Sequence, residues 1–180
     1  KPLSPSGLRI ARRGMRLASE LGLPLVTVID TQGAALSPEA ENGGLAGEIA
    51  RCLSDLVTLD APTLCLMLGE GNGGGALAFL PADRVVAAQH AWLSPLPPEG
   101  AAAIVHRDLD HAPEMARAQQ VRAIDLHARG IVDRIVVEHP DAADEPEAFC
   151  RRVGAVLEHE LAALLASGPG APADRARHYV

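Results

Sequence analysis

The chain has 180 residues, a net charge of −7 at pH 7 and only 2% aromatic residues. This length suits a hydrophobic core of ordinary size, and we expect residues 1–180 to form a single domain. The negative charge argues against a nucleic-acid partner, and the scarcity of aromatic rings argues against base stacking. The longest apolar runs, such as Leu64–Leu68, are far too short to cross a bilayer, so no membrane partner is expected.

The cysteines are Cys52, Cys65 and Cys150, an odd number with wide spacing. No CxxC pair occurs, so we predict no structural zinc site, and the scattered histidines suggest no other metal site. Cys52 and Cys65 lie in apolar patterns and are expected to be small buried side chains. The absence of a disulfide framework or an apolar leader favours a reducing, cytoplasmic location. Because no initiator methionine is present, we expect the sequence to be processed or part of a longer chain.

Hydrophobic spacing in the first half predicts two helices, over residues 5–22 and 45–59. Short β-branched or apolar runs at residues 25–29 and 63–68 are typical of buried parallel strands. Residues 31–44, rich in Gly, Pro and Asn, are expected to form a loop.

Further elements are predicted in the second half. They are a short helix at 76–80, strands at 84–88, 91–93 and 131–137, and helices at 99–106, 113–120, 123–128 and 145–166. We expect residues 168–180 to form a loose tail. Strands that alternate with helices at this spacing indicate an α/β fold with a parallel sheet flanked by helices.

The strongest local signal is the stretch Gly69–Gly75, in which five of seven residues are glycine. It lies between a predicted buried strand and a helix start, where free backbone amides favour a phosphate, a carboxylate or a developing oxyanion. Its match to GxGxxG is weak evidence for a nucleotide site, because the pattern follows the second strand and lacks the later acidic residue. A tight turn without a ligand stays open as an alternative.

Two other segments are expected to belong to the same site. Asp30–Ala34 follows the first strand directly, so its glycine turn should lie at the same sheet edge as Gly69–Gly75. Asp30 and Glu70 are expected to brace these loops. Glu99 and Gly100 begin a predicted helix whose small residues permit close backbone approach. No GxSxG nucleophile or Ser–His–Asp set occurs, which favours chemistry by backbone oxyanion stabilisation.

Taken in order, several segments resemble the α-subunit half of the acetyl-CoA carboxylase carboxyltransferase, in the crotonase-like superfamily. The resemblance rests on LPLVTVIDTQGA (23–34), AENGGLAGEIAR (40–51), APTLCLMLGEGNGGGALAFLPADRV (61–85), PPEGAAAIVHRD (97–108) and AIDLHARGIVDRIV (123–136). It implies a crotonase-like ββα superhelix with a parallel sheet flanked by helices.

The resemblance also implies an activity. In that family a carboxyl group moves from carboxybiotin to acetyl-CoA, which gives malonyl-CoA for fatty acid synthesis. The biotin is carried by a separate biotin carboxyl carrier protein, and the site forms between this half and a β-type half that mainly holds the acyl-CoA. We therefore expect a β-type partner, as a subunit or an upstream domain, an oligomeric assembly, and no activity from this half alone.

By position, the resemblance assigns the biotin-side oxyanion donors to the amides of Gly74 and Gly75. It assigns the lining of the biotin pocket to seven further residues: Gly33, Ala34, Gly71, Gly73, Ala76, Glu99 and Gly100.

The chain departs from the family pattern at Gln32 and Pro97, where Pro and Ser are usual, and at Asn72 and Gly73, where Gly and Ser are usual. Two alternatives therefore remain. One is a malonate decarboxylase-type or other crotonase-like subunit, and the other is a structural partner that has kept the fold without catalysis.

Overall fold

The computed structural model describes residues 2–176 of the chain. Within this range five strands form one sheet. They are β1 (Leu25–Thr31), β2 (Thr63–Asn72), β3 (Arg84–Ala88), β4 (Trp92–Ser94) and β5 (Arg134–Val136).

Nine helices connect or follow the strands in the described range. They are α1 (Pro5–Leu21), α2 (Pro38–Asn42), α3 (Leu45–Val57), α4 (Gly73–Leu77), α5 (Pro98–Val105), α6 (Ala112–Gln119), α7 (Ala123–Ala128), α8 (Pro146–Ser167) and α9 (Pro172–Ala176). None of the described helices is long and apolar enough to cross a membrane.

The ends of α1 show how local sequence sets a helix boundary. The Ser4 hydroxyl accepts a hydrogen bond from the Gly7 N–H, and Pro5 occupies the first turn, where no N–H is needed. Gly22 ends the helix with φ +62°, a left-handed conformation that suits glycine.

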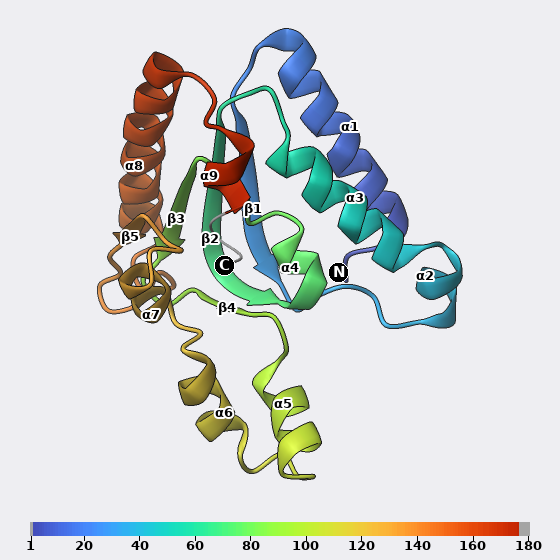
Figure 1. Ribbon diagram of the computed structural model, residues 1–180. Coiled ribbons are helices and arrows are strands. Elements are labelled where there is room, and N and C mark those ends of the chain that lie inside the picture. Colours follow the sequence, from blue (N-terminus) through green and yellow to red (C-terminus); the bar gives the residue numbers. More distant parts are fainter. Residues whose placement is uncertain (1, 177–180) are drawn as a thin grey trace.

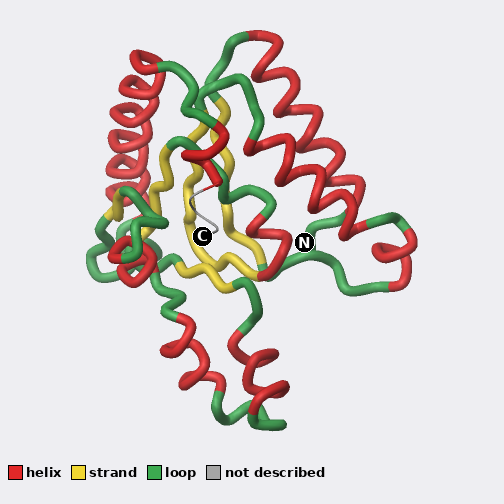
Figure 2. Tube along the Cα trace, viewed as in Figure 1, coloured by secondary structure: helices red, strands yellow, loops and turns green. Residues whose placement is uncertain are grey.

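All strand pairings are parallel, in the order β1-β2-β3-β5, and β4 pairs with the far end of β2 (Figures 1 and 2). Residues 64–67 of β2 pair with β3, whereas residues 70–72 pair with β4. Because the strands run the same way, their carboxyl ends gather at one edge of the sheet, and this edge carries the glycine-rich first turn of α4.

Two groups of buried side chains hold the helices on the sheet. Figure 1 shows α1 and α3 side by side on one flank and α8 on the other. Leu8, Met15, Cys52 and Leu56 form the core between α1 and α3. A larger core joins the sheet to α7 and α8 and includes residues of β2 and β3 that are fully buried. The predicted α/β architecture is confirmed.

Two local predictions were wrong. Residues 31–44 contain α2, which starts with Ser37 accepting a hydrogen bond from the Ala40 N–H and with Pro38 in the first turn. The supposed turn that begins at Gly69 is partly strand, because β2 continues to Asn72 along β4. Helix α4 therefore starts at Gly73, three residues earlier than the predicted helix.

The end of the described chain also differs from the expected loose tail. Residues 172–176 form α9, and the Arg175 side chain is fully buried. Its guanidinium donates to both Asp83 carboxylate oxygens, at 2.8 and 3.1 Å, and to the Ala61 carbonyl at 2.8 Å. This charged group anchors the segment despite its Gly- and Pro-rich composition. The rest of the predicted tail, residues 177–180, lies outside the described residues.

Candidate functional site

The two glycine-containing turns that follow β1 and β2 lie directly against each other. A Cβ atom added to Gly75 would come within 3.0 Å of the Ala34 nitrogen and 3.2 Å of the Gly33 carbonyl carbon. A Cβ on Gly33, whose φ is +115°, would meet the Asn72 carbonyl oxygen at 3.3 Å. Contacts this close are possible only because both positions lack a side chain. The structure thus brings Gly33, Ala34 and Gly75 together, as the sheet topology predicted.

Several backbone amides at this junction have no acceptor among the described residues. Gly73, Gly74 and Gly75 form the first turn of α4, whose N–H groups have no acceptor along the helix. In the opposite turn the Gly33 N–H already donates to the Thr31 hydroxyl at 3.1 Å. Among residues 2–176 the Ala34 N–H donates to no acceptor. The amide offered by this turn is therefore that of Ala34, and Thr31 is a supporting residue that the sequence analysis did not single out.

Asn72 occupies the position before α4. It is only 7% exposed, its side chain makes no capping hydrogen bond, and its Oδ1 atom has no partner among the described residues. A buried amide oxygen without a donor is unfavourable by about 1–3 kcal/mol. Asn72 therefore replaces the usual family residue at a point where the fold provides no hydrogen-bond donor for its side-chain oxygen.

Two of the residues assigned to the pocket lie in the packed interior. A Cβ on Gly71 would meet the side chains of Leu93 at 2.8 Å and Ile29 at 3.0 Å. Ala76 is fully buried. Both support the position of the turn from behind.

A polar hollow of about 250 Å³ lies beside the first turn. It is lined by Pro2, Asp30, Thr31, Gln32 and Glu70. A Cβ on Gly69 would collide with the Asp30 carboxylate, so this carboxylate lies across the Gly69 backbone at the junction of β1 and β2.

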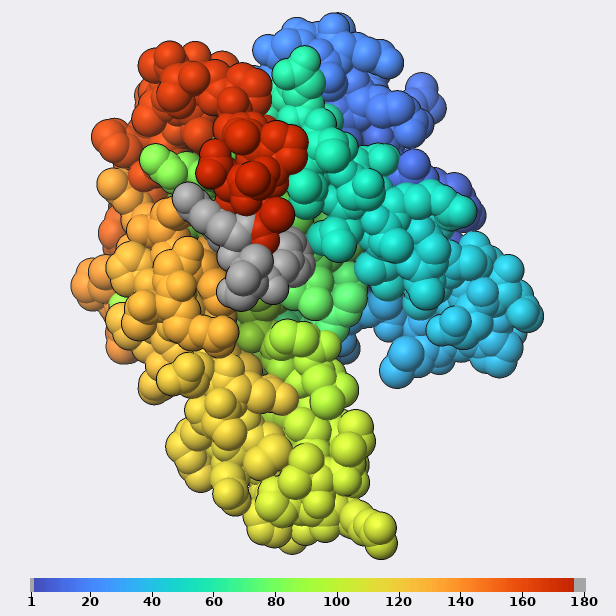
Figure 3. Space-filling model, viewed as in Figure 1, coloured from blue at the N-terminus to red at the C-terminus, as the bar shows by residue number. Residues whose placement is uncertain are grey.

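Glu99 and Gly100 are placed on a different part of the molecule. They begin α5, which packs on α6 to form an arm that projects from the sheet (Figures 1 and 3). The link to the glycine turn is Pro95, whose carbonyl oxygen would lie 3.9 Å from a Cβ on Gly73. Glu99 itself is exposed and forms no hydrogen bond with the turn in the part of the chain described.

Cys52 and Cys65 are unsuited to nucleophilic chemistry. Both are fully buried, and burial raises the pKa of each thiol to about 12. A thiol with such a pKa carries almost no thiolate at neutral pH. Their prediction as buried apolar side chains is confirmed.

These features match a known family. The family model described as "Acetyl co-enzyme A carboxylase carboxyltransferase-like" matches residues 2–178 of the sequence. The chain belongs to this family. The expected resemblance is thus confirmed.

Two curated relatives and one solved structure show the range of this carboxyltransferase-like family. A probable biotin-dependent acyl-coenzyme A carboxylase beta3 subunit of Mycobacterium bovis is 62% identical over 162 residues, which are 90% of this chain and 33% of the relative. The acetyl-coenzyme A carboxylase carboxyl transferase subunit alpha of Deinococcus radiodurans is 42% identical over 167 residues, 92% of this chain and 53% of the relative.

The solved structure is a transcarboxylase 12S hexamer with methylmalonyl-coenzyme A and methylmalonic acid bound. It superposes with a TM-score of 0.72 at 25% identity, and covers 94% of this chain and 32% of that chain. The crotonase-like fold is thereby confirmed. The chain spans between a third and about half of the length of these curated relatives.

Proposed function

We propose that this chain is the α-type half of a biotin-dependent acyl-CoA carboxyltransferase that gives malonyl-CoA from acetyl-CoA. The observation that carries the proposal is the junction of Gly33–Ala34 with the first turn of α4, in a chain that belongs to the carboxyltransferase-like family.

Because Gly33 and Gly75 lack a Cβ, the two turns lie close enough to offer backbone amides to one ligand, which we propose to be the biotin ureido group. When bound, carboxybiotin supplies a carboxyl group whose release leaves negative charge on the ureido oxygen and a basic nitrogen for the acyl α-proton.

The amides of Gly74 and Gly75 are proposed to donate hydrogen bonds to that oxygen at the positive end of α4. The Ala34 N–H, from the opposing turn, adds a third donor, and Gly33 keeps the two turns in contact. Gly71 and Ala76 hold the turn in place from the interior. Gly73 joins β2 to α4 through its φ of +60°, a conformation that a residue with a side chain rarely adopts.

Glu99 and Gly100 are proposed to complete the pocket from the α5–α6 arm in the assembled enzyme. The rest of the assembly is proposed to consist of a β-type half that holds the acyl-CoA and a biotin carboxyl carrier protein. Free thiols at Cys52, Cys65 and Cys150 are compatible with a cytoplasmic enzyme.

Reconstitution tests this proposal. The full protein, combined with its β-type half, biotin carboxylase and biotinylated carrier, should carboxylate acetyl-CoA, and the Gly75→Val variant should lose most of that rate. Propionyl-CoA as a parallel substrate measures acyl-chain preference. Decarboxylation of a malonyl thioester without biotin, in place of carboxylation, would identify a malonate decarboxylase-type subunit. No turnover with any acyl-CoA by the complete assembly would favour a structural partner.

A further inference from the structure

Three metal-ligating side chains meet where β3 and β5 end. His90 follows β3, and Glu138 and Asp141 lie in the loop after β5. The His90 Nδ1 atom is 3.2 Å from the Glu138 Oε2 atom and 3.7 Å from the Asp141 Oδ2 atom. All three ligand atoms lie within 4.8 Å of one another.

This spacing fits a single small cation. A tetrahedral zinc ion with bonds of about 2.0–2.2 Å holds its ligand atoms roughly 3.4 Å apart. The two distances from His90 bracket this value. One imidazole nitrogen with two carboxylate oxygens is also a ligand set that zinc accepts, and the two negative charges balance a divalent ion.

Glu138 is held in place as a ligand before any ion binds. Its residue is only 7% exposed, and each of its carboxylate oxygens accepts a backbone hydrogen bond. The His90 N–H donates to Oε1 at 3.0 Å, and the Ala142 N–H donates to Oε2 at 2.8 Å. The Glu138 N–H in turn donates to the Gln89 side-chain oxygen at 3.2 Å. Such outer hydrogen bonds orient the ligands of protein metal sites.

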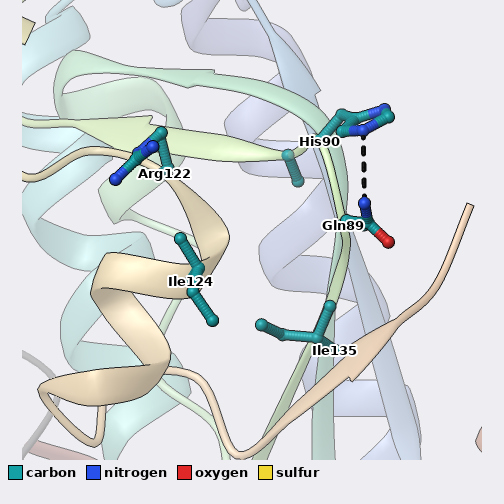
Figure 4. Close-up of a pocket in the computed structure, with 6 residues that line it drawn as sticks. Gln89, His90, Arg122, Ile124 and Ile135 are labelled. Atoms are coloured by element: carbon teal, nitrogen blue, oxygen red, sulfur yellow. Dashed lines mark hydrogen bonds between the residues drawn. The ribbon is translucent and has the colours of Figure 1, made fainter. Parts of the chain in front are cut away.

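The other two ligands are accessible to an ion in solution. The side chains of His90 and Asp141 are 49% and 56% exposed. In Figure 4 the ring of His90 extends away from Ile124 and Ile135, which line the same pocket as His90. Arg152, on α8, donates to the Val137 carbonyl and the Glu145 carboxylate.

We propose that His90, Glu138 and Asp141 bind a divalent ion of the zinc class, with solvent as the remaining ligand. The ion would join the end of β3 to the loop after β5. The proposal does not depend on the proposed carboxyltransferase activity. No sequence motif predicted it, because Glu138 lies 48 residues from His90.

The pair of Asp108 and His111 on the α5–α6 arm provides a control for testing this site. The His111 Nδ1 atom lies 2.7 Å from the Asp108 carboxylate, but no third ligand completes the pair within residues 2–176. His111→Ala therefore removes a histidine that is paired with a carboxylate without touching the proposed site.

The test is competition for Zn²⁺ between a chromophoric chelator and the untagged full protein. His90→Ala and Asp141→Asn should bind Zn²⁺ at this site at least tenfold more weakly than wild type. Wild type and His111→Ala should therefore each bind one more ion per chain than these two variants. Zn²⁺ should also raise the Tm of wild type and His111→Ala more than that of the two site variants. Because His90 and Asp141 are exposed, both variants should fold. Equal stoichiometry and equal affinity in all four proteins would overturn the proposal.

Discussion

At the scale of single residues, the candidate site depends on the absence of side chains. Gly75 and Gly74 are adjacent in α4, yet their surroundings differ. A Cβ on Gly75 would press on the Ala34 and Gly33 backbone at 3.0 and 3.2 Å, whereas a Cβ on Gly74 would meet only the Ile49 side chain at 3.5 Å. The contacts of a Cβ on Gly75 would be tighter than ordinary packing, whereas the contact of a Cβ on Gly74 would be a normal van der Waals contact.

Gly75→Ala should therefore lower the free energy of unfolding by about 1–3 kcal/mol, because the two turns must separate to admit the methyl group. Gly74→Ala should leave the free energy of unfolding within about 0.5 kcal/mol of wild type or raise it, since alanine is the better helix former. Urea denaturation of both variants provides the comparison. Equal losses in the two variants would show that the turns are not in close contact.

The sequence predicted that these two segments meet, but not that β2 continues to Asn72 or which amides are free. Asp30–Ala34 and Gly69–Gly75 were placed at one sheet edge because parallel strands end together. The Gly33 N–H donates to the Thr31 hydroxyl because of the conformation of the turn, and the pattern of residues does not fix that conformation. The buried Oδ1 of Asn72 likewise follows from packing around the turn.

At the scale of elements, α9 shows where sequence reasoning fails. The acceptors of the Arg175 guanidinium include the carbonyl of Ala61, 114 residues earlier, and the carboxylate of Asp83. No local pattern predicts such contacts. In contrast, α2 was missed although its signal is local: Ser37 and Pro38 form a standard helix start. The long helices α1, α3 and α8 were predicted because hydrophobic spacing extends over several turns.

The buried pair of Arg175 and Asp83 should make stability depend on pH. Burial alone would raise the pKa of Asp83, but hydrogen bonds from Arg175 and Thr63 outweigh it and hold this pKa below its ordinary value. A carboxylate whose folded-state pKa is lowered stabilises the fold above its unfolded pKa of about 3.9, and this contribution is lost as the pH falls through the folded value.

Arg175→Met should therefore cost about 3–5 kcal/mol at pH 7, because it leaves the Asp83 charge buried without its partner. The difference from wild type should shrink as the pH falls, because the Asp83 carboxyl that has lost Arg175 takes up a proton at a higher pH than the paired one. Urea denaturation at pH 7 and pH 3 measures both values. A difference that stays the same at the two pH values would show that the Asp83 charge does not respond to Arg175.

At the scale of the whole molecule, we propose that the chain supplies one side of a reaction centre. The glycine junction lies at the sheet edge, while the α5–α6 arm with Glu99 projects from the sheet (Figure 1). Ile104, Val105 and Leu109 on this arm are 71%, 65% and 61% exposed. This arrangement supports the proposal that a β-type half completes the site. The sequence predicted the fold from strand–helix alternation, but the projection of the arm follows from packing of α5 on α6.

Backbone amides of the glycine turn are proposed to stabilise the ureido oxyanion. Replacement of the Gly74 amide with an ester removes the N–H without adding a side chain, and carboxyl transfer is then assayed in the reconstituted complex. An ester at Gly14, in the middle of α1, controls for the loss of a backbone donor elsewhere. The ester at Gly74 should slow carboxyl transfer by about 10²–10³, while the ester at Gly14 leaves the rate unchanged. A folded, assembled enzyme that transfers the carboxyl group at the wild-type rate with the Gly74 ester would show that this amide does not stabilise the oxyanion.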